Sequence, residues 1–311
     1  MKATVLYMLL ALAMLASCAD SYETQQRIDK QRREELRRED SLSLKVAVVP
    51  SLDCLPLYVA KERRLFDTLG VDVHLKIFKA AIDADVALRE GYVEGAVSDL
   101  VRTERIARQG VAMNYVSTTI AGWQLLANRK SRVKALNQLG DKMLAMTRYS
   151  ALDYLTEENL NGVKTKAQVF RIQINDPQIR LRMLLNNELD AVWLAEPYAT
   201  MAREANNPVL ADSRDKFVSL GVVAFRSKSM EDKRRKQQLQ LFIKAYNMAC
   251  DSINTRGFDT YASIFEKYYD VHSAALKKLP KTKFLHASAP RKEDIDKASA
   301  FAATTLKSTD R

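Results

Sequence analysis

From Leu44 to Phe225 the sequence alternates short apolar runs with segments of helical length. Most of the expected strands contain β-branched or aromatic residues. The strands lie at residues 45–49, 71–77, 95–97, 113–118, 123–127, 143–146, 167–172, 190–194 and 218–225. Helical patterns fill most of the gaps, and the tail from Met230 is almost wholly helical. Such alternation indicates largely parallel sheets covered by helices on both faces. We therefore predict an α/β chain with two lobes around a central cleft and a helical C-terminal tail.

The N-terminus has the plan of a secretory signal. Lys2 supplies a positive charge, residues 5–15 are apolar but too few to span a bilayer, and small residues lead into Cys18. A cysteine at the cleavage point resembles the lipobox of bacterial lipoproteins. The resemblance implies removal of residues 1–17, lipidation of Cys18, and attachment to a membrane of the cell envelope, facing the periplasm or the exterior. A plain cleaved signal, or an N-terminal anchor with a chance cysteine, is the alternative.

A densely charged stretch without Gly or Pro follows Cys18. Opposite charges at helical spacing, such as Asp29 with Arg32 and Arg33, favour a solvated helix. A coiled coil is not expected, because apolar heptad positions are missing. We interpret residues 18–43 as the lipidated cysteine and a charged tether that holds the body away from the membrane.

Charge and composition exclude several function classes. The formal net charge is +11, but 49 basic residues are mixed along the chain with 38 acidic ones, so we expect no nucleic-acid partner. The histidines His74, His272 and His286 are widely spaced and predict no metal site. Cys54 and Cys250 could pair in an oxidising compartment or remain as two separate buried thiols.

Three segments carry a resemblance to a known family. Residues 50–62 read PSLDCLPLYVAKE, residues 88–99 read LREGYVEGAVSD, and residues 184–199 read LLNNELDAVWLAEPYA. In this order they resemble periplasmic solute-binding proteins of the NMT1/THI5-like group, which includes SsuA-like sulfonate, nitrate and thiamine-precursor proteins of ABC transporters. Asn187 stands where that group commonly has glycine, which a left-handed turn tolerates. Residues 136–142 resemble the group's crossover into the second lobe, with Asp141 in place of the common glycine.

The resemblance implies a type II periplasmic-binding-protein-like fold. Lobe 1 would begin with residues 44–130, lobe 2 would be residues 131–217, and residues 218–311 would return to lobe 1 and form the C-terminal helices. It further implies a lipid-anchored monomer that captures a small polar or aromatic solute and delivers it to an ABC permease and its ATPase.

Catalytic motifs and cofactor motifs are missing from the sequence. It has no nucleophile elbow and no dinucleotide or phosphate-loop glycine pattern, and it contains nine glycines in all. We therefore expect a binding protein without catalytic residues or a cofactor. A related-fold enzyme acting on a small carboxylated substrate, or a solute-sensing lipoprotein without transport, are the alternatives.

Ligands of open α/β sheets bind beyond the carboxyl ends of strands. Nine residues in or beside such loops are candidate ligand contacts: Ser51, Asp53, Asp99, Thr118, Arg148, Tyr149, Ser150, Trp193 and Glu196. In the second lobe, free helix amides and Arg148 would hold an anionic group.

Each candidate also has a purely structural interpretation. Ser51 and Asp53 suit a turn, Asp99 and Ser150 suit helix caps, and Glu196 suits the first turn of a helix. For the other four, the alternatives are strand, surface or core positions.

Overall fold

The computed structural model describes residue 22, residues 24–35 and residues 40–309 of the 311-residue chain. It divides into two units, Met1–Ser43 and Leu44–Arg311. In the first unit, residues 24–35 are helical with exposed side chains, and the Arg33 Nε donates to the Asp29 carbonyl over 3.1 Å. These residues form the solvated helix that their charge spacing predicts. The proposed signal peptide and Cys18 lie outside the described residues.

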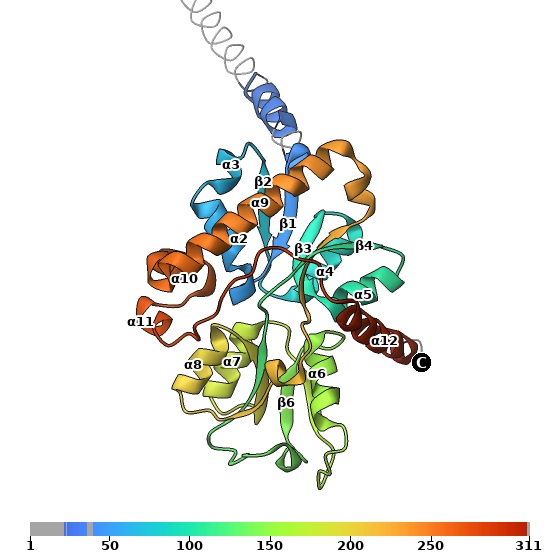
Figure 1. The fold of residues 1–311 in the computed structure, drawn as a ribbon, viewed down its shortest axis with the longest axis vertical. Coiled ribbons are helices and arrows are strands. Elements are labelled where there is room, and N and C mark those ends of the chain that lie inside the picture. The colour runs from blue at the N-terminus through green and yellow to red at the C-terminus, as the bar shows by residue number, and fades with distance from the viewer. Residues whose placement is uncertain (1–21, 23, 36–39, 310–311) are drawn as a thin grey trace, which may run out of the picture. The chain divides into compact units, whose positions relative to one another are not determined.

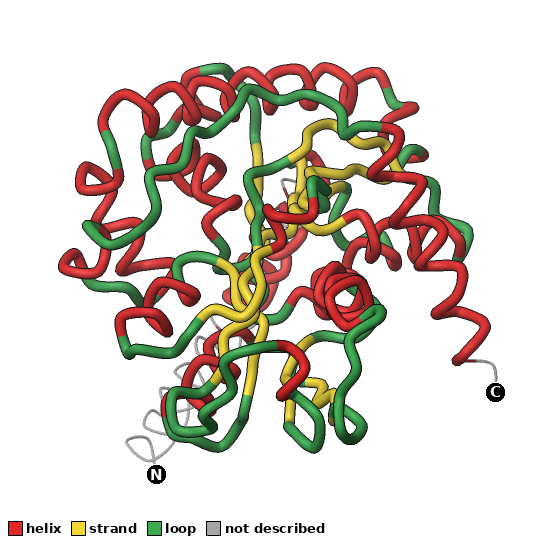
Figure 2. The backbone as a smooth tube through the Cα atoms, turned by 60° about the horizontal axis from the view of Figure 1, so that its bottom comes forward, coloured by secondary structure: helices red, strands yellow, loops and turns green. Residues whose placement is uncertain are grey.

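Two five-stranded sheets occupy the described part of the second unit (Figures 1 and 2). The first sheet has the order β2-β1-β3-β10-β4, with strands β1 (Leu44–Val48), β2 (Val73–Ile77), β3 (Gly95–Asp99), β4 (Met113–Thr118) and β10 (Gly221–Arg226). The second has the order β7-β6-β8-β5-β9, with strands β5 (Trp123–Ala127), β6 (Met143–Met146), β7 (Phe170–Gln173), β8 (Ala191–Ala195) and β9 (Val209–Asp212).

The chain crosses between the sheets twice, from β4 to β5 and from β9 to β10. In the first sheet β1 is parallel to β2 and β3, whereas β10 is antiparallel to its neighbours. In the second, β6 is parallel to β7 and β8, whereas β5 is antiparallel to β8 and β9. The predicted first lobe, residues 44–130, includes β5, but β5 pairs within the second sheet. Strand periodicity alone does not say which sheet a strand joins.

Helices cover both sheets (Figure 2). Those that follow a strand are α2 (Leu55–Glu62), α4 (Ala81–Glu90), α5 (Leu100–Arg108), α6 (Ala151–Leu160), α7 (Pro177–Leu185) and α8 (Tyr198–Glu204). The others are α3 (Leu65–Thr68), α9 (Lys233–Arg256), α10 (Ala262–Tyr269), α11 (Ser273–Leu276) and α12 (Lys292–Thr309). The helix α9 packs against α2, and α12 packs against α5 and α6 (Figure 1). The architecture predicted from the sequence, two α/β lobes with a helical tail, is confirmed, except that residues 277–291 of the tail are not helical.

Apolar clusters fill both lobes, and the cluster that contains Trp193 of the second lobe also includes Leu100 and Val222 of the first. In the first, the Phe225 ring of β10 meets the Phe242 ring of α9 edge-on, with centroids 5.4 Å apart. Gly95 lies beneath Phe225, where a Cβ would come within 2.5 Å of that ring, so β3 requires glycine there. In the second lobe, Trp193 is fully buried and its indole Nε1 donates to the Thr156 Oγ1 over 2.9 Å.

Cys54 and Cys250 are separate, buried, free thiols, which decides between the two predicted states. Burial raises the pKa of the Cys250 thiol to about 12, so it stays protonated at neutral pH. No helix in the described residues combines the length and the apolar character needed to cross a bilayer.

Candidate binding site between the two sheets

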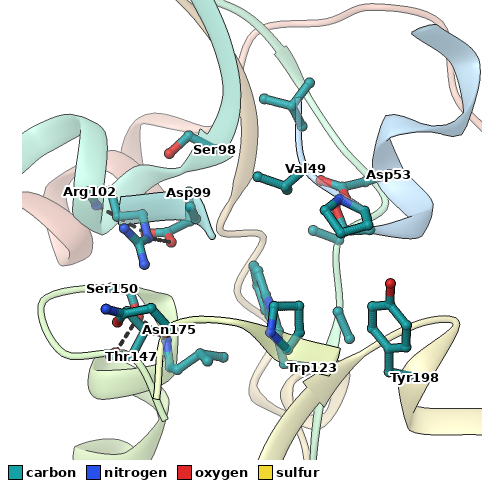
Figure 3. Close-up of a pocket in the computed structure, with 18 of the residues that line it drawn as sticks. Val49, Asp53, Ser98, Asp99, Arg102, Trp123, Thr147, Ser150, Asn175 and Tyr198 are labelled. Atoms are coloured by element: carbon teal, nitrogen blue, oxygen red, sulfur yellow. Dashed lines mark hydrogen bonds and ion pairs between the residues drawn. The ribbon is translucent and has the colours of Figure 1, made fainter. Parts of the chain in front are cut away.

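A cavity of about 100 Å³ lies between the two sheets (Figure 3). Its walls come from the loops and helix starts that follow β1, β2 and β3 in one lobe and β6, β7 and β8 in the other. This is the expected position for a ligand site in open α/β sheets. Pockets for drug-sized ligands span roughly 300–1,000 Å³, so this cavity suits a molecule of only a few heavy atoms.

Asp53 forms one side of the cavity. It belongs to the short 3-10 helix Leu52–Cys54 after β1 and is 6% exposed. Its carboxylate accepts hydrogen bonds from the Ser51 Oγ at 2.5 Å and the Thr119 Oγ1 at 3.0 Å. Among the described residues, no cation forms an ion pair with it. Burial raises the pKa of the Asp53 carboxyl, and the two hydroxyl groups only partly oppose this rise.

Asp99, at the end of β3, connects the two lobes. One carboxylate oxygen accepts from the Arg102 amide in α5 and from the Ala151 amide in α6, both at 3.0 Å. The other oxygen lies 3.1 Å from the Arg102 Nε. Arg102 also bonds to the Asp85 carboxylate. Asp99 is therefore satisfied by one cation and by the first turns of helices from both lobes.

Arg180, in the first turns of α7, contributes a buried cation to the wall. It is 5% exposed, and its guanidinium donates to the carbonyls of Trp193 at 3.0 Å and Ile174 at 2.5 Å and to the Thr147 Oγ1 at 3.1 Å. In the described part of the chain, no carboxylate lies within ion-pair distance of it. Burial, and next the charge of Arg102, lower the pKa of Arg180 to about 10, so it remains protonated at neutral pH.

Uncharged groups complete the lining. The Ser98 Oγ is buried and has no hydrogen-bond partner among the described residues. Trp123 and Tyr198 supply aromatic surface (Figure 3). The Tyr198 hydroxyl accepts from Gln178 at 3.0 Å and donates to the Tyr269 carbonyl at 3.3 Å, which also joins the two lobes.

Four of the nine predicted site residues line this cavity: Ser51, Asp53, Asp99 and Ser150. Ser150 caps α6 by accepting from the Leu152 amide at 3.1 Å, and Asp99 caps α5. The predicted cap roles of both residues are confirmed, and both residues also border the cavity because each cap lies at the carboxyl end of a strand.

The other five lie elsewhere. Arg148 is exposed and, with Tyr149, lines a separate open cavity near α12. Tyr149 stacks under the Arg105 guanidinium, 4.3 Å from the ring centroid. Glu196 lies just before α8; its carboxylate accepts from the Thr200 amide in that helix and borders a smaller neighbouring cavity.

Thr118 and Trp193 line none of these three cavities. Thr118 donates its amide to the Ser288 carbonyl at 2.7 Å, and Trp193 is core. The predicted anion site at Arg148 is therefore not part of the interlobe cavity, because the Arg148 side chain projects to the surface beside the other cavity.

The sequence interpretation missed Arg102, Arg180 and Ser98. A signal for Arg180 exists, since it lies one helical turn before Leu184 on the buried side of α7. A charged residue on an apolar helix stripe is a candidate for a functional site. Arg102 follows the Asp99 cap by three residues, a spacing at which opposite charges meet on a helix.

Comparisons with known structures define the fold. The Escherichia coli periplasmic aliphatic sulphonate binding protein SsuA has a TM-score of 0.69 at 16% identity, covering 85% of this chain and 88% of its own. The Xanthomonas axonopodis pv. citri alkanesulfonate-binding protein SsuA, bound to MOPS, has 0.69 at 15%, covering 86% and 92%. The Synechocystis PCC 6803 periplasmic nitrate-binding protein NrtA has 0.64 at 11%, covering 81% and 74%. At these identities the likeness shows the fold, that of two-lobed periplasmic binding proteins.

The family model described as the NMT1-like family matches residues 37–257, well over half of the sequence. The chain belongs to the NMT1-like family, as its three motifs predict. No curated protein sequence matches this chain.

Proposed function

We propose that this protein is the substrate-binding component of an ABC importer, which captures a small polar solute between its lobes and delivers it to a membrane permease. The observation that carries the proposal is the interlobe cavity, whose wall holds buried charged groups that suit a polar ligand better than an apolar one. The names of the sulphonate-binding and nitrate-binding structural relatives are consistent with a small polar solute.

Binding would be coupled to closure of the lobes. The two lobes already meet through direct hydrogen bonds, including Leu52 amide to Glu196 carbonyl at 2.9 Å and Ala151 amide to Asp99 at 3.0 Å. A solute that touches both lobes makes its full set of contacts only in this closed arrangement. It would therefore shift the population of the protein toward the closed form, which the permease would recognise.

The sequence of residues 1–18 supports attachment to a membrane outside the cytoplasm through a lipidated Cys18. Several acyl chains on one cysteine would anchor the protein firmly, since each buried methylene contributes ~0.8 kcal/mol. Metabolic labelling with a fatty acid tests this anchor, and label that persists on Cys18→Ala would contradict it.

Solute binding is tested by thermal-shift screening followed by calorimetry. The panel should contain sulfonates, nitrate, carboxylates, amines, amino acids and pyrimidines. A ligand that stabilises the protein should lose affinity in Asp53→Asn and Arg180→Gln. The exposed residues Asp67 and Arg182 offer the control variants Asp67→Asn and Arg182→Gln, which should retain it. Stabilisation by none of the solutes would overturn solute capture, and equal affinity in all four variants would overturn the assignment of the interlobe cavity as the binding site.

A further inference from the structure

The two ends of the interlobe cavity carry charges that the protein leaves without an ion-pair partner among its described residues. At one end, the Asp53 carboxylate is contacted by two neutral hydroxyl groups, those of Ser51 and Thr119. An ionised carboxylate can accept about four hydrogen bonds, so it retains capacity for a further donor. Burying such a charge is costly unless a counter-charge or additional donors satisfy it.

The opposite end carries the complementary charge. Arg180 bonds to two carbonyl oxygens and to the Thr147 hydroxyl, all of them neutral. Its Nη1 and Nε donate in these bonds, which leaves the Nη2 donors for another acceptor. Figure 3 places Thr147, the partner of Arg180, on the side of the cavity away from Asp53.

The other charged groups near the cavity either have ion-pair partners or are exposed to solvent. Arg102 is flanked by the carboxylates of Asp99 and Asp85, and Asp99 also accepts two backbone amides. Lys79 lines the cavity but is exposed to solvent. Asp53 and Arg180 are thus the charged wall groups that a ligand would have to satisfy.

We propose that the site takes a small zwitterion, whose ammonium or other cationic N–H group binds Asp53 and whose carboxylate or sulfonate binds Arg180. The inference rests on the proposed function and specifies its substrate class. The cavity of about 100 Å³ limits the ligand to a few heavy atoms between the two charges. The unpartnered Ser98 hydroxyl offers a further hydrogen bond to the ligand.

Matched probes separate the contribution of each charge. β-Alanine carries both charges, propionate lacks the amine, and propylamine lacks the acid. Taurine and ethanesulfonate form a second pair in which sulfonate replaces carboxylate. Calorimetry on the full chain should show that at least one zwitterion binds. Each partner with a single charge should bind about ten- to a hundredfold more weakly, as expected when one charged hydrogen-bonding group is lost.

Variants assign each charge to its residue. Asp53→Asn should remove most of the preference for β-alanine over propionate, while Arg180→Gln should remove the preference for β-alanine over propylamine. Arg180→Lys keeps the charge and should retain part of that preference, which guards against a simple folding defect. The surface variants Asp67→Asn and Arg182→Gln should leave both preferences unchanged.

The outcomes distinguish this inference from the function it rests on. If a purely anionic, purely cationic or neutral solute of the wider panel binds as tightly as any zwitterion, the zwitterion inference is wrong while solute capture stands. Preferences that survive in Asp53→Asn and Arg180→Gln also overturn it. If no solute in the panel binds, both the inference and the proposed function fail.

Discussion

Asp53 and Asp99 occupy similar places in the fold but have different partners. Each follows or ends a strand of the first sheet, each lines the interlobe cavity, and each is 6% exposed. Asp99 is paired with Arg102 and accepts two helix amides, one of them from the other lobe. Asp53 has two hydroxyl partners and no cation among the described residues.

The difference shows that burial alone does not identify a ligand-binding group. A buried carboxylate with a cation and backbone donors is already stabilised by the protein. A buried carboxylate contacted only by neutral groups lacks a counter-charge. The same contrast separates Arg102 from Arg180. We therefore expect Asp99 to act mainly in stability and Asp53 mainly in affinity, and four measurements test this division.

The largest effect is expected for Asp99→Ala. The substitution removes the acceptor of the first-turn amides of α5 and α6 and leaves Arg102 with one carboxylate partner, Asp85. Breaking a buried ion pair typically costs ~3–5 kcal/mol, and we expect a loss of this size in the free energy of unfolding. Urea denaturation of the unliganded protein measures it. A loss below about 1 kcal/mol would mean that Asp99 contributes little to stability.

Asp53→Asn should affect ligand binding instead. Removing a charged hydrogen-bonding partner costs ~1.5–3 kcal/mol of binding free energy, or roughly ten- to a hundredfold in Kd. The unfolding free energy of the unliganded protein should not fall, because an amide of the same size replaces an unpaired buried charge. Calorimetry and urea denaturation on the same preparation give both quantities. Lower stability with unchanged affinity would assign Asp53 to the turn.

Much of the fold follows from the sequence because its signals are local. Strand and helix periodicity identify nearly all the elements, and the two residues that replace glycine, Asp141 and Asn187, both have φ of 64°. The exception is β9 (Val209–Asp212), a short edge strand whose side chains are mostly exposed or half-buried and which gives no clear alternation. The pairing of β5 was also missed, because it depends on contacts distant in sequence.

The site is harder to predict than the fold because its groups act through their partners. Sequence position identifies Asp53 and Asp99 as cleft residues. It does not show that Asp99 bonds to Ala151, 52 positions away, or that Arg180 lacks a carboxylate among the described residues. Arg148 has the better local context for an anion site, yet its side chain is exposed and lines another cavity.

The pH dependence of stability sharpens the contrast further. Burial raises the pKa of folded Asp53 above its ordinary value of 3.8. As pH rises, the unfolded chain loses this proton first, so the wild-type protein loses stability up to the folded pKa. The amide that replaces this carboxyl in Asp53→Asn does not titrate. The stability of Asp53→Asn relative to wild type should therefore grow as the pH rises above the ordinary carboxyl pKa.

Asp99 also has a raised pKa, through burial, but it is present in both proteins, so its own titration largely cancels from the difference. Urea denaturation of the two proteins across this pH range provides the comparison. A constant difference would mean that Asp53 has the same pKa in the folded and unfolded states. If the difference instead shrinks toward neutral pH, the pKa of folded Asp53 is lowered rather than raised. The folded protein would then stabilise Asp53 as a carboxylate.

The smallest effect is expected for Arg148→Ala, which tests the boundary of the site. Arg148 is exposed and does not line the interlobe cavity, whereas Arg180 does. Surface substitutions typically change stability by about 0.5 kcal/mol or less, and we expect Kd for the bound solute to stay within about twofold. Arg180→Gln, measured alongside, should weaken binding about ten- to a hundredfold. If Arg148→Ala weakens binding as much as Arg180→Gln, the anionic end of the solute lies at the start of α6 beside Arg148. The ligand would then extend beyond the interlobe cavity, and its two ends would not be bound by Asp53 and Arg180.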